Sequence, residues 1–331
     1  MIHTLSCNAQ NGKHAIASNL IDGIGFGTTE FHVVRPSSEI LAEWVHKFLR
    51  QPKILNSATE LFTGSVGQQR VPESFIGDLE IPLPPLPEQK RILAILNEQM
   101  SGVEKARAAA EAQLQAAKTL TAAYLREVFD SPEAQKWERK TLGDICRDIS
   151  DGSHFTPTYI SKGIPFLSVK DVKETGISFN DCRYISEEQH KDLCRRCKPE
   201  IGDVLYTKVG TTGIAKSVDV EREFSIFVSV ALLKLTPQVL PDYLEKILNS
   251  PLCRVQSANL TQGAANRNLV IRDIKRITLP LPPLEVQQHL VTVITEDMTN
   301  MKHLQRSLQD QLNTIKQLPA ALLRQAFNGE L

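Results

Sequence analysis

Two long stretches of the chain carry apolar side chains at alternating steps of three and four residues. The first lies within residues 88–129, which contain no proline and only one glycine, Gly102. Such steps define a heptad seam along one face of an α-helix. A helix of about 42 residues would be roughly 60 Å long, since each residue adds about 1.5 Å. The apolar positions of this seam are Leu96, Met100, Val103, Ala110, Leu114, Ala117, Tyr124 and Val128.

A second seam lies 198 positions further on and keeps the same register (280 − 82 = 198). Residues 82–86 and 280–284 both have the sequence PLPPL, and the match runs without a gap to the end of each seam. Two seams in one register are suited to pack against each other, although two amphipathic helices could also serve only as core. A duplicated unit predicts two similar, separately addressed binding sites. The second seam comprises Ile294, Met298, Met301, Leu308, Leu312, Ile315, Leu322 and Ala326.

Residues 137–284, between the two seams, have the pattern of a mixed α/β domain. Alternating or apolar runs at Ile164–Val169, Asp203–Val209 and Phe224–Leu235 predict strands, because Gly, Asp, Ser and Pro turns separate them. Residues Pro241–Asn249 predict a short helix with one apolar face.

The segment before the first seam repeats only the later part of this domain. Phe31–Val34 parallels Val230–Leu233, and the apolar helix face recurs at a shift of 199, whereas residues 137 to about 199 have no counterpart. We therefore predict an α+β fold with four segments. These are the C-terminal part of a first domain (1–86), a long helix (87–136), a complete second domain (137–284) and a second long helix (285–331).

Composition restricts the class of protein without defining it. A chain of 331 residues suits two or three domains, and its 41% hydrophobic and 23% charged fractions are ordinary for a globular protein. The absence of a signal segment and of a long apolar run predicts a cytoplasmic protein with no membrane partner. The formal net charge is zero, which argues against indiscriminate nucleic-acid binding but is compatible with sequence-specific binding.

The six cysteines do not indicate a metal centre. Cys194 and Cys197 have the spacing of metal ligands, but no second Cys or His pair accompanies them. We expect reduced, structural thiols and no metal.

Two loops of the second domain carry side chains suited to DNA contacts. The loop from Lys208 to Gly213 offers a cation and two hydroxyls, on Lys208, Thr211 and Thr212, which suit phosphate contacts. A plain glycine turn is the alternative. The loop at residues 261–268 offers amides and a guanidinium, the groups that pair with adenine and guanine edges. Its candidate residues are Gln262, Asn266, Arg267 and Asn268.

Two further sites extend this set of candidates. Residues 63–70 occupy the matching place in the first copy and are also rich in amides, with one arginine. His154, in an Asp-Gly-Ser-His turn, could also contact DNA, but such a histidine often satisfies local backbone groups instead. The first-copy candidates are Ser65, Gln68, Gln69 and Arg70.

Motifs for catalysis are absent from the sequence. There is no GxxxxGK[ST] phosphate loop, no HExxH metal helix and no Asn/Asp-Pro-Pro-Tyr/Phe motif of an adenine methyltransferase. A coiled-coil adaptor that does not contact DNA is the main alternative to a DNA-binding protein. It would explain the helices and the neutral charge, but not amide-rich loops at matched positions.

In its complete order the chain resembles a specificity subunit of a type I restriction-modification system. Residues 140–152 (KTLGDICRDISDG) resemble the opening of the family's recognition domain, and residues 202–216 (GDVLYTKVGTTGIAK) resemble its central strand-loop-strand. Residues 81–92 (IPLPPLPEQKRI) and 279–290 (LPLPPLEVQQHL) resemble its junctions between proline run and helix. The resemblance covers essentially the whole chain.

The resemblance implies a function. Each globular unit would be a target-recognition domain for one half of a split sequence in double-stranded DNA. The helices would form an antiparallel coiled coil that sets the spacing between the half-sites. The chain would bind no cofactor and have no catalytic activity. It would recruit two methyltransferase subunits, which use S-adenosylmethionine to methylate adenine, and restriction (translocase) subunits, which use ATP and Mg²⁺.

The chain departs from the family pattern at its start, where the opening half of the first recognition domain is missing. We expect either a truncated subunit, which could be an inactive relic, or an upstream segment supplied by another chain. Because family members with one recognition domain function as pairs, a homodimer of Trp137–Leu331 through the long helices is a further hypothesis.

Overall fold

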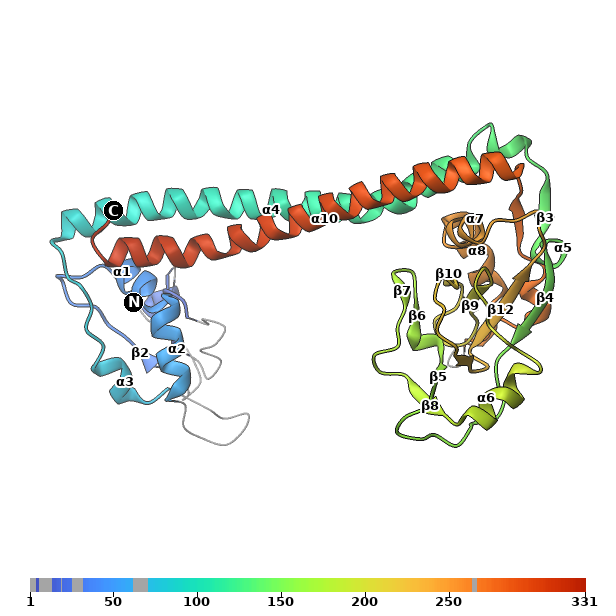
Figure 1. The fold of residues 1–331 in the computed structure, drawn as a ribbon. Helices are drawn as coiled ribbons and strands as arrows, with labels where there is room; N and C mark the ends of the chain where they lie inside the picture. Colours follow the sequence, from blue (N-terminus) through green and yellow to red (C-terminus); the bar gives the residue numbers. More distant parts are fainter. Residues whose placement is uncertain (1–3, 6–13, 19, 26–31, 62–70, 264–266) are drawn as a thin grey trace. The chain divides into compact units, whose positions relative to one another are not determined.

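The computed structural model describes residues 4–5, 14–18, 20–25, 32–61, 71–263 and 267–331. The chain divides into two compact units, Met1–Gln115 with Arg306–Leu331, and Ala116–Gln305. Both units contain part of the two long helices, α4 (Leu86–Asp130) and α10 (Leu284–Phe327) (Figure 1). The helices are therefore shared between the units.

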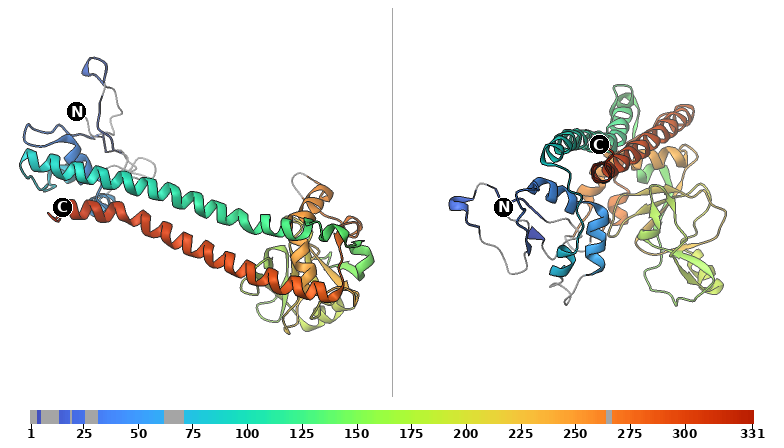
Figure 2. Two further views of the ribbon diagram at one scale, coloured as in Figure 1. Left: turned by 90° about the horizontal axis from the view of Figure 1, so that it is seen from above. Right: turned by 90° about the vertical axis from the view of Figure 1, so that its left-hand side faces the viewer.

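The predicted seams form the contact between α4 and α10 within each unit. Every residue of the two seams is buried or half-buried. In the first unit, Leu93 and Leu96 near the start of α4 cluster with Leu323 and Phe327 near the end of α10. The two helices thus run antiparallel there, as predicted, and they lie side by side in both views of Figure 2.

The second seam lacks an apolar side chain between Met301 and Leu308, where the steps of three and four place Gln305. Gln305 of α10 donates a hydrogen bond from its side-chain nitrogen to the backbone oxygen of Ala117 in α4, at 2.7 Å, within the second unit. The first unit instead has an apolar contact farther along the helices. That contact comprises Ala110, Leu114, Leu308, Leu312 and Ile315.

The central sheet of the second unit has four antiparallel strands in the order β10-β9-β12-β4. All residues of β9 and the first four of β12 are buried, as expected for interior strands whose two faces are covered. The strands are β4 (Cys146–Asp151), β9 (Val204–Thr207), β10 (Ala215–Ser217) and β12 (Val230–Leu235).

Smaller sheets complete this unit. The strand β11 (Ser225–Ile226) runs parallel to β5 (Ile164–Leu167), which pairs on its other side with β8 (Arg183–Ile185). Two antiparallel pairs are β3 (Arg139–Thr141) with β13 (Thr278–Pro280), and β6 (Val172–Lys173) with β7 (Gly176–Ile177).

The helices of the second unit are mostly short. The predicted helix at residues 241–249 is α7, whose apolar face is fully buried. The short helices are α5 (Leu142–Ile145), α6 (Glu187–Cys194), α7 (Pro241–Leu248), α8 (Pro251–Leu260) and α9 (Ile271–Ile274), with 3₁₀ turns η3 (Ala134–Lys136) and η4 (Val169–Asp171).

One predicted strand is divided in the structure. The run Phe224–Leu235 forms β11 and β12 in two different sheets. The division occurs because the Val230 N–H donates to the Phe227 oxygen at 2.9 Å, which closes a turn between the strands. A continuous apolar run does not reveal such a turn.

In its described residues, the first unit has a smaller set of elements. Strand β1 (Thr4–Leu5) pairs antiparallel with β2 (His32–Val33), and η2 (Ile21–Gly23) is a 3₁₀ turn. The helices before α4 are α1 (Ala42–Leu49), α2 (Pro52–Glu60) and α3 (Glu73–Gly77). No helix within the described ranges combines the length and hydrophobicity of a membrane span.

A buried glutamine makes the same hydrogen bonds in both units. Gln89 and Gln287, which the sequence repeat aligns, are both fully buried. Each side-chain oxygen accepts a hydrogen bond at 2.9 Å from a backbone N–H, that of Leu41 or Leu240 respectively. Each side-chain nitrogen donates to two backbone oxygens, at 2.8 and 2.9 Å. Those oxygens belong to Glu39 and Pro84 in the first unit and to Gln238 and Pro282 in the second.

An aromatic pair joins the globular part to a long helix in the same way in both units. Phe327 of α10 lies 4.6 Å from Trp44 of α1, and Phe129 of α4 lies 6.0 Å from Tyr243 of α7, between ring centroids. Trp44 and Tyr243 also donate hydrogen bonds to the first proline oxygen of each PLPPL run, at 2.8 and 2.7 Å. Although one ring system is Trp and the other Tyr, the construction is the same.

Candidate nucleic-acid interface

The structure brings together the two loops predicted to contact DNA in the second unit. The Gly210 N–H donates to the Arg267 oxygen at 2.9 Å, and the Leu269 N–H donates to the Lys208 oxygen at 2.7 Å. These backbone bonds connect the loop after β9 with the loop after α8, although the bonded residues are about sixty positions apart in the chain. The loops therefore form one surface.

The described side chains of this surface differ in exposure. Thr211, Gln262 and Arg267 are exposed, so their hydrogen-bonding groups face solvent. Thr212 is half-buried, and its hydroxyl lies 3.1 Å from that of Thr261. The fifth candidate, Asn268, is half-buried and forms reciprocal 2.9 Å backbone bonds with Gln262. Asn266 lies outside the described residues.

Lys208 has a different place from the one expected. Its side chain is 6% exposed, and its Nζ lies 3.2 Å from Asp151 Oδ2 and 3.3 Å from the Val228 oxygen. In this conformation the ammonium neutralises a buried carboxylate and supports the loop from inside. A direct contact with phosphate stays a prediction that requires another side-chain conformation.

Asp151, at the end of β4, connects three basic side chains. Besides Lys208, its carboxylate lies 3.0 Å from His154 Nε2 and 2.6 Å from Arg196 Nη2. Burial opposes ionisation of Asp151, but hydrogen bonds with His154 and Lys208 outweigh this effect, so the pKa of Asp151 is below its usual range. His154 and Arg196 are themselves 51% and 60% exposed. The predicted candidate His154 is thus held at the surface by a buried carboxylate.

Sequence reasoning missed two residues beside His154. Arg196 lies between the two cysteines that were considered as metal ligands, and only the fold brings it to Asp151, 45 residues away in the chain. Phe155 is 83% exposed. An aromatic residue directly after a histidine in a Gly-Ser-His turn is a signal that could have drawn attention to Phe155.

The candidates of the first copy, Ser65, Gln68, Gln69 and Arg70, lie outside the described residues.

The cysteines in the described part of the chain are free thiols. Burial raises the pKa of Cys197 to about 11, so this thiol is protonated at neutral pH. No group of three or more metal-binding side chains occurs among the described residues.

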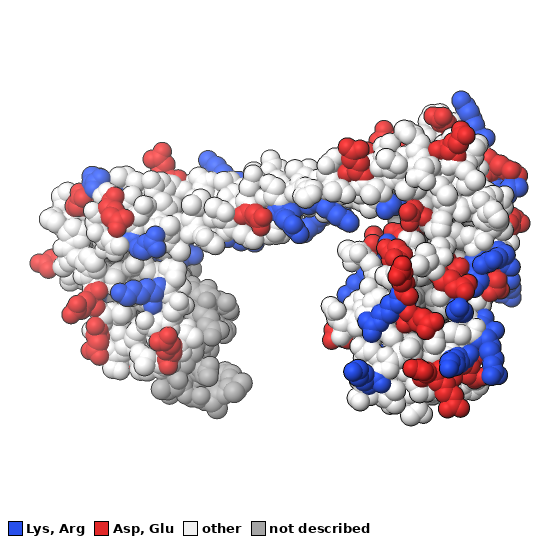
Figure 3. Space-filling model, in the orientation of Figure 1, with Lys and Arg blue, Asp and Glu red and all other residues white. Residues whose placement is uncertain are grey.

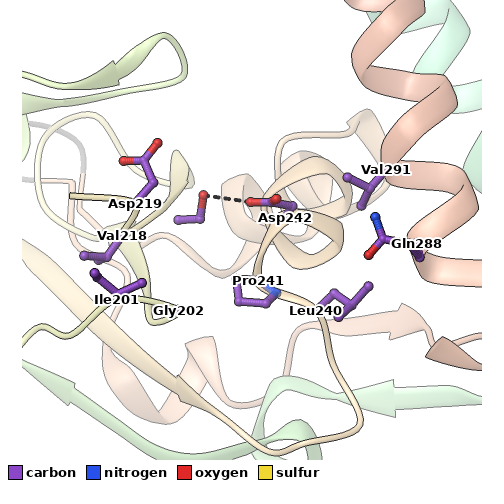
Figure 4. Close-up of a pocket in the computed structure, with 10 residues that line it drawn as sticks. Ile201, Gly202, Val218, Asp219, Leu240, Pro241, Asp242, Gln288 and Val291 are labelled. Atoms are coloured by element: carbon purple, nitrogen blue, oxygen red, sulfur yellow. Dashed lines mark hydrogen bonds between the residues drawn. The ribbon is translucent and has the colours of Figure 1, made fainter. Parts of the chain in front are cut away.

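A pocket of about 250 Å³ in the second unit is distinct from the loop surface (Figure 4). Two carboxylates, Asp219 and Asp242, line it together with apolar Ile201, Leu240 and Val291. Acidic groups repel phosphate, so this pocket is not suited to the DNA backbone. On the face of this unit shown in Figure 3, basic and acidic side chains are interspersed without forming one large patch.

Comparison with known proteins identifies the family. The model of the type I restriction modification DNA specificity domain matches residues 3–110 and 134–314. The chain belongs to this family, which confirms the resemblance found in its motifs.

Three specificity subunits with known names are similar to this chain. The chain is 25% identical over 318 residues to the EcoKI specificity subunit of Escherichia coli K12, with 90% of this chain and 68% of the relative covered. It is 38% identical over 135 residues to the EcoAI specificity subunit of Escherichia coli, covering 39% and 23% respectively. It spans 63% of the length of the EcoBI specificity subunit.

Two solved structures share the fold. One is a chain of a type I R-M system studied for its complex assembly and conformational transition, with a TM-score of 0.74 and 23% identity. The superposition with that structure covers 92% of this chain and 75% of the solved chain. The other is the HsdS subunit from Thermoanaerobacter tengcongensis, with a TM-score of 0.61, 24% identity and coverage of 91% and 74%.

Proposed function

We propose that this chain is the DNA specificity subunit of a type I restriction-modification system, in which each unit recognises one half of a bipartite target. The observation that carries the proposal is the repeated construction of the two units around Gln89 and Gln287. Two units built on the same buried hydrogen bonds, in a family of DNA specificity domains, are suited to the same task performed twice.

In the second unit, the proposed DNA contact is the surface formed by loops 208–213 and 261–268. Exposed Gln262 and Arg267 offer donors and acceptors that match base edges in the major groove. Backbone bonds between the loops place these two residues on one surface, so little backbone freedom is lost on binding. A coiled-coil adaptor would have no need for this arrangement.

The chain would act without catalysis of its own. Methyltransferase subunits would supply the reaction, transferring a methyl group from S-adenosylmethionine to adenine, and restriction subunits would use ATP and Mg²⁺. A second copy of this chain, pairing through the long helices, is a further candidate partner, and such a homodimer would present two copies of the complete recognition domain.

Matched surfaces on the long helices support two equivalent methyltransferase sites. Leu120 of α4 and Leu318 of α10 occupy the same repeat position and are 42% and 40% exposed. Near Leu120, the second unit has a groove of about 580 Å³ that α4 and α10 both line. Near Leu318, the first unit has a groove of about 790 Å³ lined by α10. Arg126 and Arg324, another matched pair, line the two grooves. Equivalent surfaces suit two copies of one partner.

The two-site arrangement is tested by changing Leu120 to Asp or Leu318 to Asp and weighing the complex by native mass spectrometry. Each change should remove one methyltransferase copy, and the double variant should remove both. Gln113→Asp and Gln311→Asp, at matched exposed positions of the same helices, should keep both copies. Full occupancy of the leucine variants would overturn this assignment of the surfaces.

DNA recognition is tested by selection from a pool of randomised duplexes, with the full chain alone and with methyltransferase subunits. We expect enrichment of one bipartite sequence with a fixed spacer. A coiled-coil adaptor would bind all duplexes equally or none, so neither preparation would enrich a sequence.

A further inference from the structure

We propose that Phe155 and Arg196 form an additional DNA contact of the second unit, in which the Phe155 ring packs on a base and the Arg196 guanidinium binds an adjacent acceptor. This inference rests on the proposed function and assigns it two residues outside loops 208–213 and 261–268.

The backbone that leads into Phe155 is fixed by hydrogen bonds and close packing. The Ser153 hydroxyl accepts a hydrogen bond from the Phe155 N–H at 3.2 Å and donates one to the Phe155 oxygen at 2.7 Å. Ser153 itself bonds through its backbone to Ile226 and Val228, each at 3.0 Å. Before it, Gly152 packs so closely that an added Cβ would lie 2.0 Å from the Ile226 oxygen. The turn is therefore rigid up to the aromatic residue.

The exposure of Phe155 is not explained by the packing of the fold. The ring is 83% exposed, and Phe155 is the only aromatic residue among the strongly exposed large apolar residues of the described chain. A single exposed aliphatic side chain needs no explanation, but a large ring on a rigid turn, directly after His154 in the chain, is a different case. Aromatic rings at such places stack on bases or insert between base steps.

Arg196 is oriented by a buried carboxylate. Its Nη2 lies 2.6 Å from Asp151 Oδ1 and 3.4 Å from His154 Nε2. Nε and Nη1 have no hydrogen-bond partner within the described residues, so their donors are available for a base edge or a phosphate. Its neighbour Arg195 is 82% exposed, and its side chain forms an ion pair with exposed Asp192 at 3.3 Å. The guanidinium of Arg196 is thus preorganised and that of Arg195 is not.

The same network connects this contact to the predicted loop surface. Asp151 holds Arg196 and His154 through one oxygen and Lys208 through the other. The backbone oxygen of Lys208 in turn accepts a hydrogen bond from the N–H of Leu269, two residues after Arg267. Arg196 and His154 are therefore joined to the loop that carries Lys208 through a shared buried carboxylate, and Phe155 directly follows His154 in the chain.

The test uses the full chain with its methyltransferase subunits and a pool of randomised duplexes. Phe155→Ala should relax one or more base positions in a single half-site and weaken binding to the wild-type sequence by about 5- to 100-fold. Arg196→Ala should weaken binding within the same range and, if it binds a phosphate, lower the salt slope by about one. Both variants should fold, since both side chains are largely exposed.

Two controls separate this contact from general surface effects. Arg195→Ala removes the neighbouring cation and Ile201→Ala removes another exposed apolar side chain, and both should select the wild-type sequence. If Phe155→Ala and Arg196→Ala also select that sequence with unchanged affinity, the inference is overturned and the proposed function stands. If the wild-type chain itself enriches no sequence, the proposed function fails and the inference fails with it.

Discussion

At the scale of single residues, the buried glutamines contribute most to the junction between globular part and long helix. Gln287 is completely buried, and its amide satisfies one backbone N–H and two backbone oxygens. Leaving buried backbone groups without partners costs about 1–3 kcal/mol each, so the amide is needed where an apolar residue would otherwise fit.

We therefore expect Gln287→Leu to lower the free energy of unfolding of the second unit by roughly 2–4 kcal/mol. Urea unfolding followed by hydrogen exchange would measure the loss and locate it. The adjacent exposed residue supplies the control, since Gln288→Leu should change stability little. Equal stability of the two variants would show that the matched hydrogen bonds do not hold the junction.

Asp151 makes the stability of the second unit depend on pH. Its pKa is lowered in the folded state, so its ion pairs stabilise the fold above its unfolded pKa of about 3.9. This stabilisation is lost as the pH falls through the lower folded pKa. The stability difference between wild type and Asp151→Asn should be constant above about pH 5 and shrink at lower pH. Urea unfolding at pH 7, 5, 4 and 3 measures it; a difference that does not change with pH would contradict the assignment.

The same residues show what the sequence could and could not predict. The loop with Lys208 was found from its residue types, but nothing local shows that Lys208 turns inward to a carboxylate 57 residues away. Arg196 lies between Cys194 and Cys197, and nothing in the neighbouring sequence indicates its contact with Asp151. Partners distant in the chain are determined by the fold, and residue types predict only what a side chain is able to bind.

At the scale of elements, the long helix α4 has a weak position at a glycine. Gly102 lies inside α4, and a Cβ added there would meet no atom within 4 Å. Glycine destabilises a helix interior by about 0.8–1 kcal/mol relative to alanine. Gly102→Ala should therefore stabilise α4 by about that amount, measured as slower amide exchange around residue 102 and a higher melting temperature. Unchanged or faster exchange would mean that the helix needs flexibility there.

The helices were predictable because a heptad pattern depends only on local periodicity and repeats over many turns. Every seam residue is buried or half-buried as predicted. The sheets were less predictable, since the run Phe224–Leu235 has the same apolar pattern whether it forms one strand or two. The turn at Phe227–Val230 depends on a backbone bond that side-chain types do not encode.

At the scale of the whole molecule, α4 and α10 are the chain segments common to both units. Adding one heptad to α4 after Gln115 and one to α10 after Gln305 would lengthen each helix by about 10 Å while keeping the seam register. We expect selected DNA targets with a spacer about three base pairs longer and unchanged half-site sequences, because DNA rises about 3.4 Å per base pair. An unchanged spacer would show that helix length does not set it.

The most direct measurement is single-molecule methylome sequencing of host cells, with this gene intact and deleted. Recognition of two half-sites by one chain predicts that deletion abolishes N6-methyladenine at one bipartite sequence and leaves other methylated sites as they were. A methylome that is the same in both strains would contradict the account.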